Sequence, residues 1–96
     1  MNRAAMLKFR LYVAGDAQNS TLAVSNLSSL CRTYLHGRHE IEVVDVFLQP
    51  KRALADGILM TPTLLKFSPS PLRRIIGTLS HQEPVLQALG LEPAPA

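Results

Sequence analysis

Few side chains of this 96-residue sequence have the types and spacing that catalysis or metal binding needs. The one cysteine, Cys31, excludes an intrachain disulfide and a C-x-x-C redox pair. The three histidines, His36, His39 and His81, do not form a recognisable metal-ligand set with it. His36 and His39 flank Gly37 in a predicted turn, where we expect solvated side chains. The sequence therefore predicts no metal, no cofactor and no catalytic residue.

A helix predicted over residues 21–36 determines whether Cys31 is accessible. Its apolar residues recur at the spacing of one buried face: Ala23, Leu27, Leu30, Cys31 and Tyr34. We expect Cys31 to pack inside, far from the helix N-terminus that would lower the pKa of its thiol. Asn19 or Ser20 is predicted to cap the helix. Ser20 could also act as a glutathione-type hydroxyl, but no base lies near it in the sequence.

The remaining elements complete an α/β pattern. Short apolar runs bounded by Gly, Pro or Ser predict strands over residues 7–14, 40–47, 63–67 and 72–76. Apolar residues on both sides of the second strand suggest a central or parallel position. A short helix follows Pro50, and a terminal helix over 81–89 has a capping box at Ser80 and Glu83, with Gly90 as its stop.

The order βαβαββα fits one domain over residues 1–91, followed by a loose tail over 92–96. A four-stranded mixed sheet of the thioredoxin-like architecture accommodates this order. A proline before the third strand, Pro62, stands where such folds carry a cis peptide bond. A thioredoxin-type enzyme also needs a cysteine at the start of its first helix, and residues 16–20 contain no sulfur.

Composition and charge limit which locations and which classes of partner we expect. The chain is 47% hydrophobic and 18% charged, with a net charge of +3. No apolar run approaches the roughly 20 residues that a membrane helix needs, and the N-terminus lacks a secretory signal, so we expect a cytoplasmic location. Lys66, Arg73 and Arg74 on the hairpin are predicted to bind a partner, and an acidic protein is favoured over nucleic acid. A solvated edge that deters aggregation is the alternative.

Several segments together carry a family resemblance. They are Leu11-Tyr-Val-Ala-Gly15, Asn19-Ser20, Val44-Asp-Val46, Thr61-Pro-Thr-Leu64, Arg73-Arg-Ile-Ile-Gly77 and Leu79-Ser80. The chain resembles the KaiB family of circadian clock proteins over residues 11–90. The resemblance implies a non-enzymatic protein that binds the ATPase ring of KaiC and modulates its phosphorylation cycle. It also implies two folds, a thioredoxin-like monomer that binds the ATPase and a tetramer with a rearranged C-terminal half.

Three prolines and two departures from the family pattern bear on which of the two folds we expect. Pro62, Pro69 and Pro71 would form the hinge of a fold switch, because X–Pro bonds isomerise slowly. Ala88 stands where the family commonly has glycine, and Gly90 where it has an acidic residue. Both changes favour the terminal helix, so we expect the thioredoxin-like state rather than the tetrameric ground-state fold.

Glu42 stands on the second strand where the family usually has a basic residue. The resemblance implicates that strand edge in KaiA capture, so KaiA, or a clock-output kinase, is a doubtful partner. A paralogue that acts as a stress or signalling adaptor is one alternative function. A thiol or glutathione enzyme on the same fold is another.

Overall fold

A computed structural model describes residues 6–91 of the chain, so the predicted tail over 92–96 lies outside the described residues. The elements run in the order β1 (Leu7–Val13), α1 (Gln18–Tyr34), β2 (His39–Asp45), α2 (Pro50–Ala55), β3 (Thr63–Ser68), β4 (Arg73–Ile76) and α3 (Gln82–Leu89). This is the predicted βαβαββα order. Within residues 6–91 no helix has the length and apolar character to cross a membrane.

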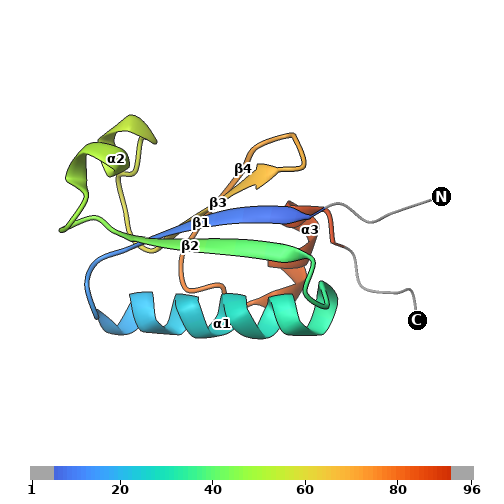
Figure 1. Cartoon of the computed structure of the whole chain (residues 1–96). Coiled ribbons are helices and arrows are strands. Elements are labelled where there is room, and N and C mark those ends of the chain that lie inside the picture. The colour runs from blue at the N-terminus through green and yellow to red at the C-terminus, as the bar shows by residue number, and fades with distance from the viewer. Residues whose placement is uncertain (1–5, 92–96) are drawn as a thin grey trace.

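The four strands form one mixed sheet in the order β2-β1-β3-β4. β1 pairs in parallel with β2, as the intervening helix α1 requires, and in antiparallel with β3. β3 and β4 form the predicted antiparallel hairpin, with Lys66 opposite Arg73. α1 runs along one face of the sheet and α2 lies over one end of the other face (Figure 1).

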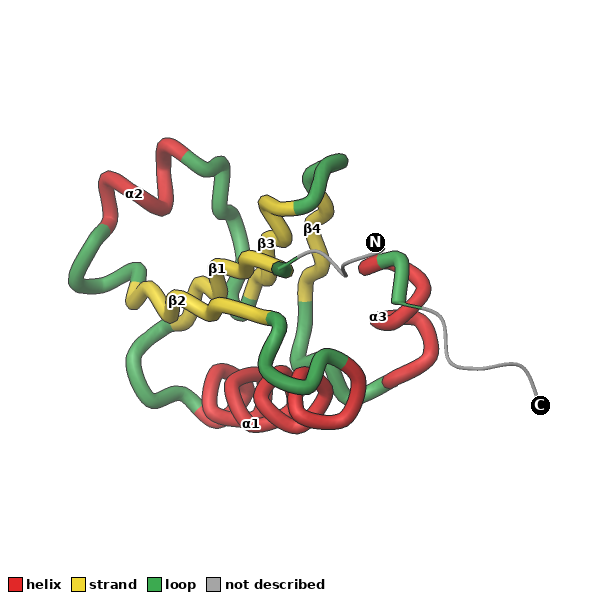
Figure 2. Tube along the Cα trace, turned by 45° about the vertical axis from the view of Figure 1, so that its right-hand side comes forward, coloured by secondary structure: helices red, strands yellow, loops and turns green. Residues whose placement is uncertain are grey.

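The sheet separates two apolar cores of unequal size. The larger core joins alternate residues of β1, among them Phe9 and Leu11, to the inner faces of α1 and α3. The smaller core is formed by Tyr12, Val44, Ala53 and Leu65 beneath α2. Figure 2 shows the same division, with α1 and α3 on one side of the strands and α2 on the other.

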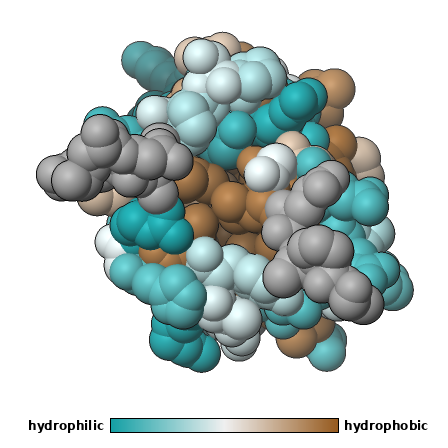
Figure 3. Space-filling view, turned by 90° about the vertical axis from the view of Figure 1, so that its right-hand side faces the viewer, coloured by the Kyte–Doolittle hydropathy of each residue, from teal (hydrophilic) through white to brown (hydrophobic). Residues whose placement is uncertain are grey.

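The ends of the sheet differ in how they are covered. α2 covers the end at which β1 and β2 finish. Figure 3 looks onto the opposite end, where apolar atoms gather in the middle of a hydrophilic rim.

Two features of the strands depend on which parts of the sheet the helices cover. β2 is parallel to β1 as expected, but it is an edge strand, and Val43 is half exposed. Its apolar residues on both sides arise because Val44 lies beneath α2 and Ile41 packs towards α1. Tyr12 lies on the same face of β1 as Lys8 and Arg10, since alternate residues of a strand share a face. It is fully buried, because α2 covers that end of the face.

Both predicted side-chain caps are wrong. α1 begins after Ala17, without a capping hydrogen bond from a side chain, and both Asn19 and Ser20 lie inside the helix. α3 likewise begins after His81 without such a bond. The Ser80 hydroxyl instead makes hydrogen bonds with Thr78 and Asn26, which tie the β4–α3 connection to α1. Gly90 ends α3 as predicted, with a left-handed φ of 75°.

Candidate functional site

The loop between β1 and α1 occupies the place of a catalytic cysteine in thioredoxin-type enzymes, and here it is built around hydroxyl and carboxylate acceptors. Ser20 is buried, and its Oγ accepts a hydrogen bond of 3.0 Å from the backbone N–H of Ala14. Asp45 accepts hydrogen bonds from the N–H groups of Gly15 and Phe47. These hydrogen bonds fix the β1–α1 loop. The hydrogen-bond partner of the Ser20 hydroxyl is a backbone N–H and not a basic side chain.

Cys31 lies in the larger core, as predicted, with none of its surface exposed. Desolvation raises the pKa of its thiol to about 11. Because the thiolate is the reactive form, the buried thiol is a poor nucleophile at neutral pH.

The three histidines lie in different surroundings. Residues 6–91 contain no group of three His, Cys, Asp or Glu side chains placed to hold a metal ion. His36 and His81 are exposed. His39 was also predicted to be solvated, and this is wrong for one atom: its Nδ1 is buried without a hydrogen-bond partner. The reason is that His39 opens β2, opposite Leu7 of β1, and is therefore part of the sheet.

The three basic residues of the hairpin do not form one patch. Lys66 is only 4% exposed, and its side chain lies on the α1 side of the sheet together with that of Leu64. Desolvation, and then the nearby charge of Arg73, lower the pKa of Lys66. Arg73 is exposed on this same side. Arg74 projects towards α2, where its guanidinium donates to the backbone carbonyls of Asp56 (2.7 Å) and Gly57 (3.3 Å). Lys66 is therefore a poor direct contact for a partner.

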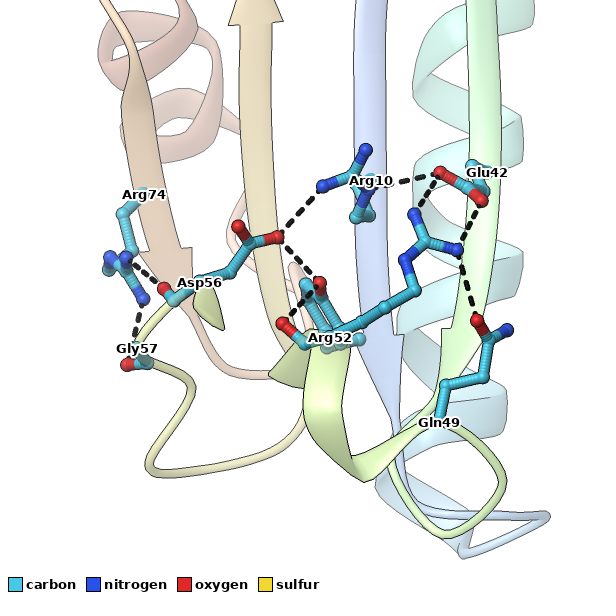
Figure 4. A network of polar contacts seen from close by, with 8 residues as sticks. Arg10, Glu42, Gln49, Arg52, Asp56, Gly57 and Arg74 are labelled. Atoms are coloured by element: carbon cyan, nitrogen blue, oxygen red, sulfur yellow. Dashed lines mark hydrogen bonds and ion pairs between the residues drawn. The ribbon is translucent and has the colours of Figure 1, made fainter. Parts of the chain in front are cut away.

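A chain of ion pairs crosses the α2 side of the sheet (Figure 4). Glu42 on β2 accepts from Arg52 of α2 at 2.7 and 2.8 Å and from Arg10 of β1 at 3.0 Å. Arg10 also donates to Asp56 at 2.8 Å. The buried Tyr12 hydroxyl donates to the same carboxylate and lies 3.1 Å from the backbone oxygen of Arg52. Through these contacts, polar groups tie α2 to β1 and β2 in addition to the smaller core.

The carboxylates of this network are held in their charged form. Hydrogen bonds from Arg52 and then Arg10 lower the pKa of Glu42 to about 2. The hydrogen bond from Tyr12, followed by that from Arg10, lowers the pKa of Asp56 although burial opposes it. Glu42, which the sequence marked as an unusual acid on β2, is thus neutralised by two arginines of the same chain.

An exposed apolar surface surrounds α2, and the sequence analysis did not predict it. We call it the apolar pole, and it consists of Phe47, Leu48, Leu54, Leu59 and Met60. Leu59 is 93% exposed and Phe47 73% exposed. The available signal was the presence of large apolar residues next to Gln49, Pro50 and Gly57: Phe47 ends the strand predicted over residues 40–47, and Leu54 lies in the short helix predicted after Pro50.

The predicted hinge residues lie at the joints of the second half. Pro62 is buried before β3 and follows a cis peptide bond, as expected, and the bonds before Pro69 and Pro71 in the hairpin connector are cis as well. Ala88 lies in the last turn of α3 and Gly90 follows it. Their role in fold switching stays a prediction.

Comparison with solved structures identifies the architecture. The N-terminal domain of SasA from Synechococcus elongatus superposes with a TM-score of 0.74 at 20% identity, over 100% of this chain and 94% of that one. Mitochondrial thioredoxin 3 from Saccharomyces cerevisiae superposes with a TM-score of 0.67 at 18% identity, over 91% and 77% of the two chains. The fold is thioredoxin-like, as predicted.

Comparison of sequences identifies the family. The model of the KaiB domain matches residues 10–91. A circadian clock protein, KaiB3 of a Synechocystis strain, is 41% identical over 97% of this chain and 88% of its own length. A circadian clock oscillator protein KaiB of a Synechococcus strain is 48% identical over 85% of this chain and 74% of its own. The chain therefore belongs to the KaiB family of circadian clock proteins.

Proposed function

We propose that this protein is a non-enzymatic clock regulator of the cytoplasm that binds a KaiC-type ATPase ring and modulates its phosphorylation cycle. The observation that carries the proposal is the match to KaiB proteins along nearly the whole chain. The chemistry of the fold supports it. The place of the catalytic cysteine is occupied by Ser20 bonded to the backbone, and the one thiol, Cys31, is buried, which disfavours a thiol or glutathione enzyme.

The direct test is a binding measurement with a purified KaiC-type ATPase from the same organism, in the presence and absence of ATP. We expect a complex that forms with the ring and changes the phosphorylation level of the ATPase over time. A chain that neither binds the ring nor alters its phosphorylation would overturn the proposal.

Arg73 is the hairpin cation best placed for such a contact, because it is exposed and Arg74 already donates to two carbonyl oxygens. Replacing Arg73 with glutamate is expected to weaken binding several-fold at low salt and less at high salt. Arg32→Glu is the matched control, since Arg32 is also exposed but lies on α1. Equal effects of both substitutions would assign the loss to net charge alone.

Fold switching is a second part of the proposal. Pro62, Pro69, Pro71, Ala88 and Gly90 lie at the joints that a rearrangement of residues after Pro50 would use. We expect the thioredoxin-like monomer to predominate in solution. Size-exclusion chromatography and NMR secondary shifts test this. A tetramer, or helical shifts over residues 72–79, would contradict it.

One observation favours a divergent role within the family. Glu42 is occupied by Arg10 and Arg52, Glu40 is exposed on the same strand, and β2 (His39–Asp45) contains no lysine or arginine, so its edge is not basic. A KaiA-type partner that needs a basic residue there would not recognise this chain. An adaptor that serves another KaiC-like ATPase is the second candidate, and pull-down of that ATPase without KaiA would support it.

A further inference from the structure

We propose that the open edge of β4 binds an extended acidic segment of another protein as a fifth strand of the sheet. β4 is the last strand in the order β2-β1-β3-β4, so among residues 6–91 only β3 pairs with it (Figure 2). The segment is defined by its chemistry, so this assignment goes beyond the proposed function and does not depend on ATPase binding.

The backbone of β4 offers four hydrogen-bonding groups to a new strand. Gly77, just past β4, donates to the carbonyl of Pro62 at 2.9 Å. Because alternate residues of an antiparallel strand bond to the same neighbour, Ile75 also faces β3. The N–H and C=O groups of Arg74 and Ile76 therefore point outward, and no turn or loop of residues 6–91 donates to them or accepts from them through its backbone. Strand edges with unpaired groups of this kind accept extended peptides.

The side chains around this edge carry positive charge without acidic partners. Residues 57–82 contain Lys66, Arg73 and Arg74 but no aspartate or glutamate. The ion pairs among residues 6–91 include none of these three cations, and Arg74 donates to uncharged backbone carbonyls. Lys66 lies directly opposite Arg73 in the sheet, and like charges in such a pair repel each other. A carboxylate beside Arg73 would relieve this repulsion, so the charges favour an acidic segment.

An apolar groove of about 380 Å³ continues from the same edge. It lies between the end of β4 and the start of α3, and its lining includes Ile75, Ile76, Pro84 and Val85. Ile76 is 53% exposed although it belongs to a strand. A strand added to β4 would therefore place apolar side chains against both isoleucines.

The order of side chains along β4 predicts the order in its partner. Antiparallel addition is the arrangement that β3 already uses, and it is slightly more stable per residue than parallel addition. In this arrangement two successive partner residues lie opposite Ile76 and Ile75, and the next two lie opposite Arg74 and Arg73. The matching segment therefore reads apolar-apolar-acidic-acidic.

A second copy of this chain does not supply such a segment. No two of its seven acidic residues are adjacent in the sequence. Residues 92–96 contain one glutamate and two prolines, and proline has no N–H to donate to a strand edge. Two β4 edges brought together would also place the arginines of both copies in one ribbon. Another protein is therefore favoured as the source of the segment.

The probe is the synthetic peptide Thr-Val-Val-Glu-Glu-Thr with blocked ends, titrated into the isotope-labelled full chain and followed by NMR. We expect the amide signals of Arg74 and Ile76 to shift most, and their amide protons to exchange more slowly with solvent.

Two N-methylated peptides separate backbone pairing from charge attraction. Methyl groups on the nitrogens of the first valine and first glutamate block the two N–H groups that face β4. This peptide should bind with a dissociation constant at least about tenfold higher. The same groups on the second valine and second glutamate point away from β4, so that peptide should bind within about twofold of the original.

A charge exchange tests the register. Arg73→Glu should raise the dissociation constant of the acidic peptide at least about tenfold. The peptide Thr-Val-Val-Glu-Lys-Thr, whose lysine lies opposite position 73, should restore binding to this variant. Arg32→Glu on α1 is the matched control and should change neither affinity more than about twofold, after circular dichroism has shown that both variants are folded.

Three results would overturn the proposal. If no signal shifts at about 1 mM of the acidic peptide, β4 is a solvated edge that deters aggregation. Equal binding of the two methylated peptides would show that the backbone of β4 is not paired. Signals of Arg74 and Ile76 that shift with the concentration of the chain alone would make a second copy the occupant. ATPase binding is measured separately, so each of these results leaves the proposed function intact.

Discussion

Replacing Tyr12 with phenylalanine isolates one polar contact between the sheet and α2. The ring of Tyr12 stays in the smaller core, and only its hydroxyl is lost. That hydroxyl donates to Asp56 and lies 3.1 Å from the backbone oxygen of Arg52. The substitution therefore leaves the apolar packing intact while it removes a hydrogen bond to a charged group.

The size of the effect follows from what Asp56 retains. A hydrogen bond to a charged group contributes about 1.5–3 kcal/mol. Asp56 keeps its ion pair with Arg10 at 2.8 Å, so the carboxylate is not left without a partner. We expect a loss of about 1–2 kcal/mol in the free energy of unfolding, near the lower end of that range. For a domain of this size the melting temperature falls about 4–8 °C for each kcal/mol.

The pH dependence gives a second, independent readout. Tyr12 is the first cause of the lowered pKa of Asp56. A carboxylate with a lowered pKa stabilises the fold above its unfolded pKa of about 3.9, and that stability is lost as the pH falls through the folded pKa. The difference between Tyr12→Phe and the unsubstituted chain should therefore shrink below about pH 4.

Urea unfolding followed by circular dichroism at pH 7 and pH 3 measures both effects. Tyr34→Phe is the matched control, because Tyr34 is the other tyrosine and lies on α1, away from the network. If Tyr12→Phe is as stable as the unsubstituted chain at pH 7, the hydroxyl does not hold α2. If the difference is the same at both pH values, the charged carboxylate is not its partner.

Three smaller predictions test other parts of the structure. Glu42→Gln should lower the free energy of unfolding by less than about 1 kcal/mol at pH 7, because half-exposed ion pairs are weak. Because the pKa of Glu42 is lowered to about 2, the stabilisation that its carboxylate provides should disappear as the pH falls from about 4 to 2. Urea titrations should also show a smaller difference between the two chains at high salt. Cys31 should not react with a thiol reagent at pH 8 until the protein is unfolded, and rapid labelling of the native chain would contradict its burial. Gly90→Ala should destabilise the chain by roughly 1 kcal/mol in thermal melts, because alanine disfavours the left-handed φ of 75°, although no atom lies within 4 Å of the added methyl group.

The order of the elements was predictable because each is marked locally. Apolar periodicity defines α1 and β1, and prolines and glycines bound the hairpin. The burial of Cys31 followed from its position on the apolar face of α1. These features depend on residues close in the sequence, so a single chain is enough to infer them.

The arrangement around α2 was not predictable in the same way. The network joins Arg10, Glu42, Arg52 and Asp56, which come from three elements, and no local pattern shows that they meet. The burial of Lys66 likewise depends on which face of β3 the helices cover. The cap predictions failed because the Ser20 hydroxyl accepts from the backbone N–H of Ala14 and the Ser80 hydroxyl bonds to Thr78 and Asn26, instead of accepting from helix N–H groups.

The division of the interior by the sheet has a consequence for local opening. α2 rests on a core of only four buried residues and on ion pairs that salt screens, whereas α1 and α3 share the larger core. Partial unfolding can therefore release α2 without exposing the larger core. In native-state hydrogen exchange, the amides of α2 should exchange before those of β1, and added salt should widen the gap. The segment that carries the most exposed apolar surface is thus also the segment that detaches at the lowest energetic cost.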